Sequence, residues 1–321
     1  MSGRDDDVFE LDGDAGDADR GVAPVNPAAR RLQRRLAAAA VGVPALGVLA
    51  ALGLHLGGYP AGAPAYVLFV VMFVATVLGV EVGFHRYFAH GAFKTKGWVR
   101  TLLAVLGSMA LEGPVFFWAA THRRHHRYSD RPGDPHSPNL AASRWRGLWH
   151  AHVGWLFVAE VTDWARYAPD LVRDRKLFVV DRAYALWVAL GLAIPTALGG
   201  LWSMSAMGAL QGFLWGGLVR MFATHHVTWT VNSICHVFGD RPYEGRDRST
   251  NNVWLALVSL GGSWHNNHHA YPTLARNDVL WWQIDMCGWF VRLLARAHLA
   301  WDLKVPTAKM IAAMRVKRGR P

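Results

Sequence analysis

Two long stretches of the chain, 36–80 and 183–219, contain no Asp, Glu, Lys or Arg. Each is too long for one helical crossing of a bilayer, which takes roughly 20 residues, and suits two crossings joined by a short turn. A buried soluble core is the alternative, but Gly and Pro near the midpoints of both stretches favour hairpins. We therefore predict an all-α integral membrane protein with four transmembrane helices in two hairpins, at about 36–57, 64–83, 183–201 and 206–224.

A third apolar stretch, 99–120, is interrupted by Glu112 and Pro114. Proline inside a helix removes a hydrogen bond and kinks or breaks the helix. A single crossing here would also place His122 on the opposite side of the bilayer from His85 and His90. We therefore expect this stretch to lie at the membrane interface or to pack on the bundle.

The distribution of arginine orients the chain. The first apolar stretch directly follows Arg30, Arg31, Arg34 and Arg35. By the positive-inside rule these residues keep the N-terminus in the cytoplasm, and four crossings return the C-terminus to the same side. The charged sections then form a helical cytoplasmic cap. We predict a tail at 1–35 and two transmembrane hairpins at 36–84 and 183–224. The cap is formed by the two remaining sections, 85–182 and 225–321.

The net charge of +11 is unevenly distributed. The first twenty residues hold eight acidic and two basic residues, so the remainder carries 32 basic and 15 acidic residues, or +17. Residues 1 to about 30 are acidic and rich in Gly, and we expect them to be disordered. The basic remainder suits an anionic lipid surface, an acidic protein or a phosphate-bearing substrate, and we do not expect nucleic acid to be a partner.

Histidines gather in three short segments. The spacing i, i+3, i+4 places three side chains on one face of a helix, where they can point at a common centre. It occurs twice, as His122, His125 and His126 and as His265, His268 and His269. A further pair, His85 and His90, is five residues apart. In an ideal α-helix this pair lies about 140° apart, so it shares a centre only where the helix ends or where metals lie between the two side chains.

These clusters predict metal binding by imidazole, because the two cysteines are too few for a Cys-rich zinc site. A zinc site needs at most four ligands, so this many histidines imply two metals. Imidazole suits Zn, Cu, Fe and Ni, and ligand type alone does not choose between them. A haem protein or a metal transporter would place its histidines inside the spans rather than beyond their ends.

The histidine segments carry a resemblance to a known family. GFHRYFAH, WAATHRRHHRYSDRPGDPH, HVGWL, TWTVNSICH, SWHNNHHAYP and WWQID together resemble the membrane fatty-acyl desaturases of the stearoyl-CoA type, over about residues 36–300. Three histidine boxes are shared with alkane hydroxylases and sterol oxidases. DPH, HVGWL, NSxxH and WWQID narrow the resemblance to desaturases.

The resemblance implies a di-iron site with two Fe2+ ions as cofactor and O2 as co-substrate. It adds His236 as a ligand and Asn232 as a residue that reaches a metal through water. The implied iron ligands are His85, His90, His122, His125, His126, His236, His265, His268 and His269. From position alone, Asp130, Asp134 and Asp285 are candidates to orient these imidazoles. We expect His136, His150, His152 and His225 to be neighbours of the ligands or surface groups.

The implied reaction is O2-dependent introduction of a cis double bond, at carbon 9, into a saturated long-chain acyl thioester, namely acyl-CoA. An acyl-lipid desaturase, a hydroxylase and a ketolase are the alternatives. Because the reacting carbons carry no functional group, an apolar tunnel must position the chain. Trp155, Thr228 and Trp229 match positions that line the bend of this tunnel in the family.

The head-group region departs from the family pattern. The animal acyl-CoA enzymes have an Arg-Asp pair before HxxHH, where this chain has Ala120 and Thr121. The nearby Arg123, Arg124 and Arg127 are possible replacements as head-group contacts, and CoA, lipid and acyl carrier protein all remain open as carriers. No HPGG-type haem-binding segment is present. We therefore expect a separate electron donor, such as a ferredoxin or a cytochrome b5-like protein with an NAD(P)H reductase.

Overall fold

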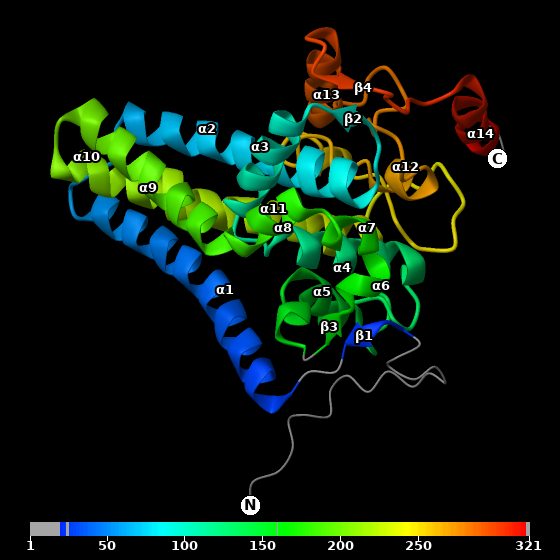
Figure 1. The fold of residues 1–321 in the computed structure, drawn as a ribbon, viewed down its shortest axis with the longest axis horizontal. Helices are drawn as coiled ribbons and strands as arrows, with labels where there is room; N and C mark the ends of the chain where they lie inside the picture. The colour runs from blue at the N-terminus through cyan, green and yellow to red at the C-terminus, as the bar shows by residue number, and fades with distance from the viewer. Residues whose placement is uncertain (1–19, 24–25, 159, 319–321) are drawn as a thin grey trace, which may run out of the picture.

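The computed structural model describes residues 20–23, 26–158 and 160–318. Long helices lie side by side at one end of the molecule, and shorter helices surround their other end (Figure 1). The long helices include two π-helical segments, η1 and η3. The long segments are α1 (Pro27–Leu56), α2 (Ala63–Leu78), η1 (Gly79–Ala89), α9 (Tyr184–Ser203), α10 (Ala206–Gln211), η3 (Gly212–Val219) and α11 (Arg220–Ser233).

The shorter helices come from two parts of the chain. The first lies between η1 and α9: α3 (Gly97–Ser108), α4 (Val115–Tyr128), α5 (Arg144–His152), η2 (Gly154–Phe157), α6 (Trp164–Tyr167), α7 (Pro169–Val172) and α8 (Arg175–Arg182). The second follows α11: η4 (Ile234–His236), η5 (Val253–Leu255), α12 (His265–Ala270), α13 (Met286–Arg296) and α14 (Ala308–Arg318). Two antiparallel strand pairs join distant segments: β1 (Val22–Ala23) with β3 (Val161–Thr162), and β2 (Lys94–Thr95) with β4 (Ala300–Trp301).

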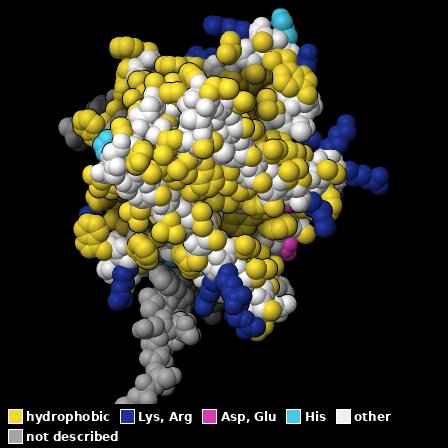
Figure 2. All heavy atoms as spheres, turned by 90° about the vertical axis from the view of Figure 1, so that its left-hand side faces the viewer, with side chains coloured by type: hydrophobic (Ala, Val, Ile, Leu, Met, Phe, Trp, Pro, Cys, Tyr) yellow, Lys and Arg dark blue, Asp and Glu magenta, His cyan; other side chains and the backbone are white. Residues whose placement is uncertain are grey.

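Within the described residues, three helices are long and apolar enough to cross a membrane: Pro27–Leu56, Ala63–Ala89 and Tyr184–Ser203. They correspond to the first three predicted crossings. The fourth, expected at 206–224, is not among them, although α10, η3 and α11 follow one another there in unbroken succession. The end of the molecule that carries α10 is covered mainly by hydrophobic side chains, with Lys and Arg at its margin (Figure 2).

The first helix begins earlier than expected. Residues 27–35 were assigned to the N-terminal tail, but α1 starts at Pro27. The side chain of Asn26 accepts a hydrogen bond from the Ala29 amide at 2.8 Å, and proline is favoured at the first helical position. Disorder was expected for residues 1 to about 30, but Val22–Ala23 form β1 and α1 is helical from Pro27. Residues 1–19 and 24–25 lie outside the described residues.

The predicted break in 99–120 is confirmed. Helix α3 ends at Ser108 and α4 starts at Val115, with positive φ at Leu111 and Gly113 between them. Arg220, in the fourth predicted crossing, is fully buried. Its guanidinium donates to the carbonyls of Gly216, Met109 and Gly191. The connection after α3 is thereby fixed to α9 and α11, because each charged donor satisfies a buried carbonyl.

Candidate metal centre

The structure brings all nine predicted histidines together in two groups, whose ring nitrogens lie within 4.8 Å of one another in each group. The first group is His85, His90, His122, His126 and His268. The second group is His125, His236, His265 and His269. Each HxxHH segment contributes to both groups. The expectation of one common centre for each segment is wrong, because positions i and i+3 point to different groups.

The π-helix η1 explains how His85 and His90 belong to one group. In a π-helix the backbone bonds join residues five apart, so such residues lie nearly above one another. The amide of His90 donates to the carbonyl of His85 at 3.2 Å, and the ring centroids are 5.0 Å apart. The wide angle expected for an α-helix therefore does not apply.

The Nε2 atoms converge in the first group. The Nε2–Nε2 distance is 2.9 Å between His85 and His268 and 2.9 Å between His268 and His126. It is 2.8 Å between His90 and His122. Five imidazoles therefore present the same ring nitrogen to a shared centre.

The second group has the same arrangement. The Nε2 of His265 lies 3.0 Å from that of His236 and 3.0 Å from that of His269. The Nε2 of His125 lies 3.4 Å from that of His269. Four imidazoles therefore converge from α4, η4 and α12.

Carboxylates hold the opposite ring nitrogen of four of these histidines. The Nδ1 distances are 3.2 Å for His85 to Glu81, 2.9 Å for His125 to Asp134, 2.9 Å for His236 to Asp130 and 3.3 Å for His269 to Asp247. An Nδ1–H that donates to a carboxylate leaves Nε2 with a free lone pair, which is the usual arrangement of a metal-binding histidine.

The facing lone pairs fit metal ions. When His125 and His269 both donate from Nδ1, no proton lies between their Nε2 atoms, and the two lone pairs repel each other. A cation between them removes the repulsion. Burial lowers the pKa of His122, His126 and His268 well below the usual value, and neighbouring imidazoles lower it further, so these rings are neutral ligands at neutral pH.

Two of the three predicted orienting carboxylates are confirmed as contacts of these histidines, Asp130 and Asp134. The prediction for Asp285 is wrong. Asp285 accepts hydrogen bonds from Arg86 at 2.8 and 2.9 Å and from the amide of Gly288 at the start of α13. Its role is to join η1 to α13.

Two further carboxylates, Glu81 and Asp247, contact ligand histidines and were not predicted from the sequence. Glu81 lies four residues before His85 on the same helix, so its spacing was a usable signal. Asp247 lies in the loop after η4, and nothing in its local sequence indicates that it reaches His269.

The histidines not expected to be ligands have other contacts. His225 Nε2 lies 2.9 Å from the carbonyl of Ala110. His152 Nε2 lies 2.9 Å from Nδ1 of His226. His136 stacks on His125 at 4.4 Å and forms a possible third group with His125 and Asp134. Of the histidines not expected to be ligands, His136 is therefore the one placed most like a metal ligand.

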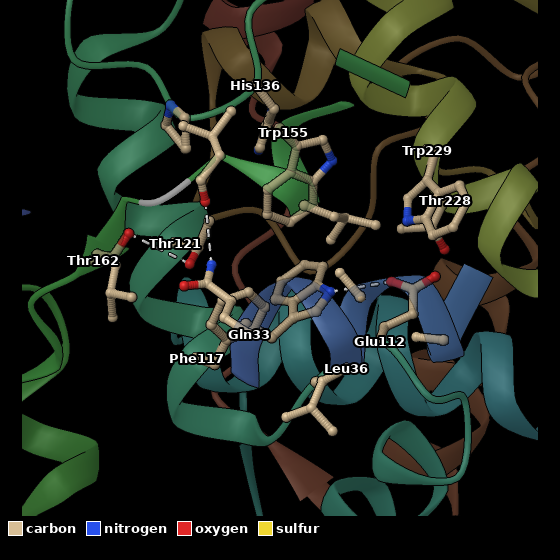
Figure 3. A pocket seen from close by; sticks show the side chains of 18 of the residues that line it. Gln33, Leu36, Glu112, Phe117, Thr121, His136, Trp155, Thr162, Thr228 and Trp229 are labelled. Carbon is tan, nitrogen blue, oxygen red and sulfur yellow. Dashed lines mark hydrogen bonds between the residues drawn. The ribbon is translucent and has the colours of Figure 1, made fainter. Parts of the chain in front are cut away.

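A cavity of about 670 Å³ adjoins the first histidine group, because His122 is part of its lining. The predicted tunnel residues Trp155, Thr228 and Trp229 line it, as does Asn232 (Figure 3). Besides α4, the lining comes from α1, β3, α9, η3 and α11. The cavity therefore adjoins both the first histidine group and several of the long apolar helices.

The three candidate head-group arginines differ in their contacts. Arg123 donates to the carbonyls of Ala89, Phe88 and Tyr167 and pairs with Asp170, so its donors are already engaged. Arg124 lines the cavity and pairs with Glu160 at 2.6 Å. Arg127 is exposed, with its guanidinium over the ring of Tyr128. Arg124 is therefore the one placed at the cavity.

Residues 61–301 match the family described as fatty acid desaturase. The chain belongs to this family. Members are membrane-bound oxidoreductases, which agrees with the apolar helices and with the histidine groups able to hold metal.

Similar proteins have three kinds of acyl carrier in their names. The chain is 45% identical over 280 residues to a hex-5-enoyl-[acyl-carrier protein] acetylenase of Moorena producens, covering 85% of this chain and 87% of that protein. It is 36% identical to an sn-1 stearoyl-lipid 9-desaturase of Synechocystis, covering 76% and 73%. It is 36% identical to an acyl-CoA C20 Delta5-desaturase of Anemone leveillei, covering 75% and 74%.

Proposed function

We propose that this fatty acid desaturase uses O2 to introduce a cis double bond at carbon 9 of a saturated long-chain acyl thioester, with CoA as carrier, for unsaturated fatty acid biosynthesis. The observation that carries the proposal is a cavity of about 670 Å³ whose lining includes His122 of the first histidine group. Such a cavity can hold an alkyl chain with its middle carbons at the metals.

The reaction balances with one O2 for each double bond. Two hydrogens leave neighbouring methylenes, two electrons come from an external donor and two protons from solvent, and O2 becomes two waters. Two Fe2+ ions, when held by the nine histidines, supply the activation of O2. Asn232, which lines the cavity, would contact one of them through water.

The residues of the protein itself position the acyl chain. Trp155, Thr228 and Trp229 form walls that restrict where an acyl chain can lie. Holding reacting groups in one geometry supplies much of the rate in such a reaction. The carboxylates on Nδ1 fix the orientation of the imidazoles, and an acyl chain that fills the cavity displaces water from it.

The membrane arrangement and the electron supply belong to the same proposal. The unbroken α10–η3–α11 segment makes the fourth crossing, which places both termini, the cap and the histidine groups in the cytoplasm. A separate ferredoxin or cytochrome b5-like protein delivers electrons from an NAD(P)H reductase. The positive charge outside the acidic N-terminal residues supports an acidic donor.

A second candidate function is supported by the similarity to an acetylenase at 45% identity. In this case the substrate already has a double bond, and removal of two further hydrogens gives a triple bond with the same balance of O2, electrons and protons. The similarity to an sn-1 stearoyl-lipid 9-desaturase likewise supports a lipid-bound acyl chain as an alternative substrate.

Lipid analysis of a host that expresses the chain tests the reaction. We expect a new cis-monoene at a single position. His268→Ala should abolish it, because His268 contacts two other imidazoles of the first group. His55→Ala, at an exposed position on α1, is the matched control and should retain it. A hydroxylated or ketonised product would contradict desaturation, and a triple bond would establish the second candidate.

The carrier is tested with purified protein and a competent donor. Stearoyl-CoA, stearoyl carrier protein and phospholipid are offered separately. Turnover of stearoyl-CoA is expected. Turnover of phospholipid alone would reject CoA and leave the desaturation chemistry standing.

A further inference from the structure

Glu112 is an acidic residue in the wall of the acyl cavity, in the connection between α3 and α4. Its Oε2 accepts a hydrogen bond from Nε1 of Trp118 at 3.3 Å, which Figure 3 draws. Its Oε1 is buried without a hydrogen bond in the described part of the chain. The hydroxyl of Thr228 points toward the same carboxyl (Figure 3).

The other acidic residues of the cavity have cationic or imidazole partners. Glu160 pairs with Arg124, and Asp134 contacts His125. Among the described residues, no salt bridge joins Glu112 to a cation. The carboxyl is therefore buried without a compensating positive charge, an arrangement that strongly favours its neutral form.

The ionisable groups around Glu112 do not offset its charge. Glu81 of η1 repels it. Tyr184 of α9 holds the amide of Gly113, and His122 of α4 lines the same cavity. On α11, His225 and Arg220 are bound to the carbonyls of Ala110 and Met109, which precede Glu112 in the same connection. Burial, with a smaller contribution from Glu81, raises the pKa of Glu112 to about 8.

Trp118 connects Glu112 to the metal centre. Its ring stacks on His122 with centroids 5.0 Å apart and planes at 23°, and it lies 6.0 Å from the ring of His85. Trp118 also lines the cavity. The indole therefore lies against two histidines of the first group at the cavity wall, and its one polar atom is held by Glu112.

We propose that Glu112 is a positioning residue of the desaturation: its uncharged carboxyl fixes the indole of Trp118, and the indole sets which methylenes of the acyl chain face the metals. The inference rests on the proposed function. An ionised Glu112 would place an unpaired charge beside an alkyl chain, which is costly to bury, so the chain would bind poorly.

The test compares Glu112→Gln with Glu112→Ala and Trp118→Phe, in full-length protein with one donor. Wild-type turnover should fall through pH 8, roughly ten-fold from pH 7 to pH 9, as the neutral fraction falls. Glu112→Gln should remove this fall and keep one double-bond position, since an amide accepts the same hydrogen bond without ionising. Asp302→Asn, at an exposed ion pair with Lys94, should keep the alkaline fall.

Glu112→Ala and Trp118→Phe should each spread the double bond over neighbouring carbons. A single unchanged position in both variants, or an unchanged alkaline fall in Glu112→Gln, would overturn the proposal. Infrared difference spectra of wild type and Glu112→Gln at pH 7 give a readout independent of turnover. The band of a protonated carboxyl should be present only in the wild type, and its absence would reject a neutral Glu112 even if the proposed function failed.

Discussion

At the scale of single residues, the chemistry of the centre depends on which ring nitrogen of each histidine is free. Carboxylates on Nδ1 settle this for one histidine of the first group and three of the second. The second group is therefore the one whose imidazoles are mainly oriented by acidic side chains. Its affinity for metal should depend more strongly on these carboxylates than that of the first group.

Asp247→Ala tests this dependence. The substitution removes the acceptor of His269 Nδ1, so the ring is free to rotate, and loss of such a partner costs roughly 10- to 100-fold in metal affinity. Titration of metal-free protein with Fe2+ should show one weakened site and one unchanged site. Asp302→Asn serves as the control, and two unchanged sites in Asp247→Ala would contradict the assignment.

At the scale of elements, apolar runs and helix breakers predicted most of the long helices and the gap around Glu112 and Pro114. The π-helix η1 was not predictable in this way, because a segment has the same composition whether its backbone bonds span four or five residues. The division of each HxxHH segment between two groups was missed for a related reason. Spacing shows which side chains share a face, but packing of a second segment decides where each one points.

The π-helix η1 packs closely on α3 where Gly79 meets Gly107, and this contact leaves no room for a larger residue at position 79. A Cβ at Gly79 would overlap the backbone nitrogen of Gly107. Gly79→Ala should therefore displace η1, which carries His85, and destabilise the protein by about 1–3 kcal/mol, the usual cost of overpacking. Thermal unfolding in detergent and bound iron should both decrease.

Gly53→Ala is the matched control for this substitution. It lies within α1, and nothing within 4 Å would meet the added Cβ. Alanine is favoured over glycine inside a helix by about 1 kcal/mol, so this variant should be at least as stable as the wild type. A Gly79→Ala protein with the same stability and iron content as Gly53→Ala would show that the contact is not required.

At the scale of the whole molecule, the charge distribution separates the acidic N-terminal residues from a strongly basic remainder. The face seen in Figure 2 carries Lys and Arg only at its margin, and the stretches 36–80 and 183–219 contain no Lys or Arg at all. Two partners compete for it, an anionic lipid surface and an acidic electron donor. The two explanations can be distinguished by experiment, because turnover in neutral detergent needs the electron donor and does not need anionic lipid.

The last prediction concerns this donor. In neutral detergent micelles, the KM for an acidic ferredoxin or cytochrome b5-like protein should rise several-fold between low and moderate salt, with kcat little changed. The reason is that exposed charges are screened over about 10 Å at 0.1 M salt, which slows encounter more than it affects the bound complex. A KM that stays constant across this range would assign the positive charge to the lipid surface. Addition of anionic lipid to the micelles provides the complementary measurement, since lipid that occupies the same basic surface should raise the KM for the donor at low salt.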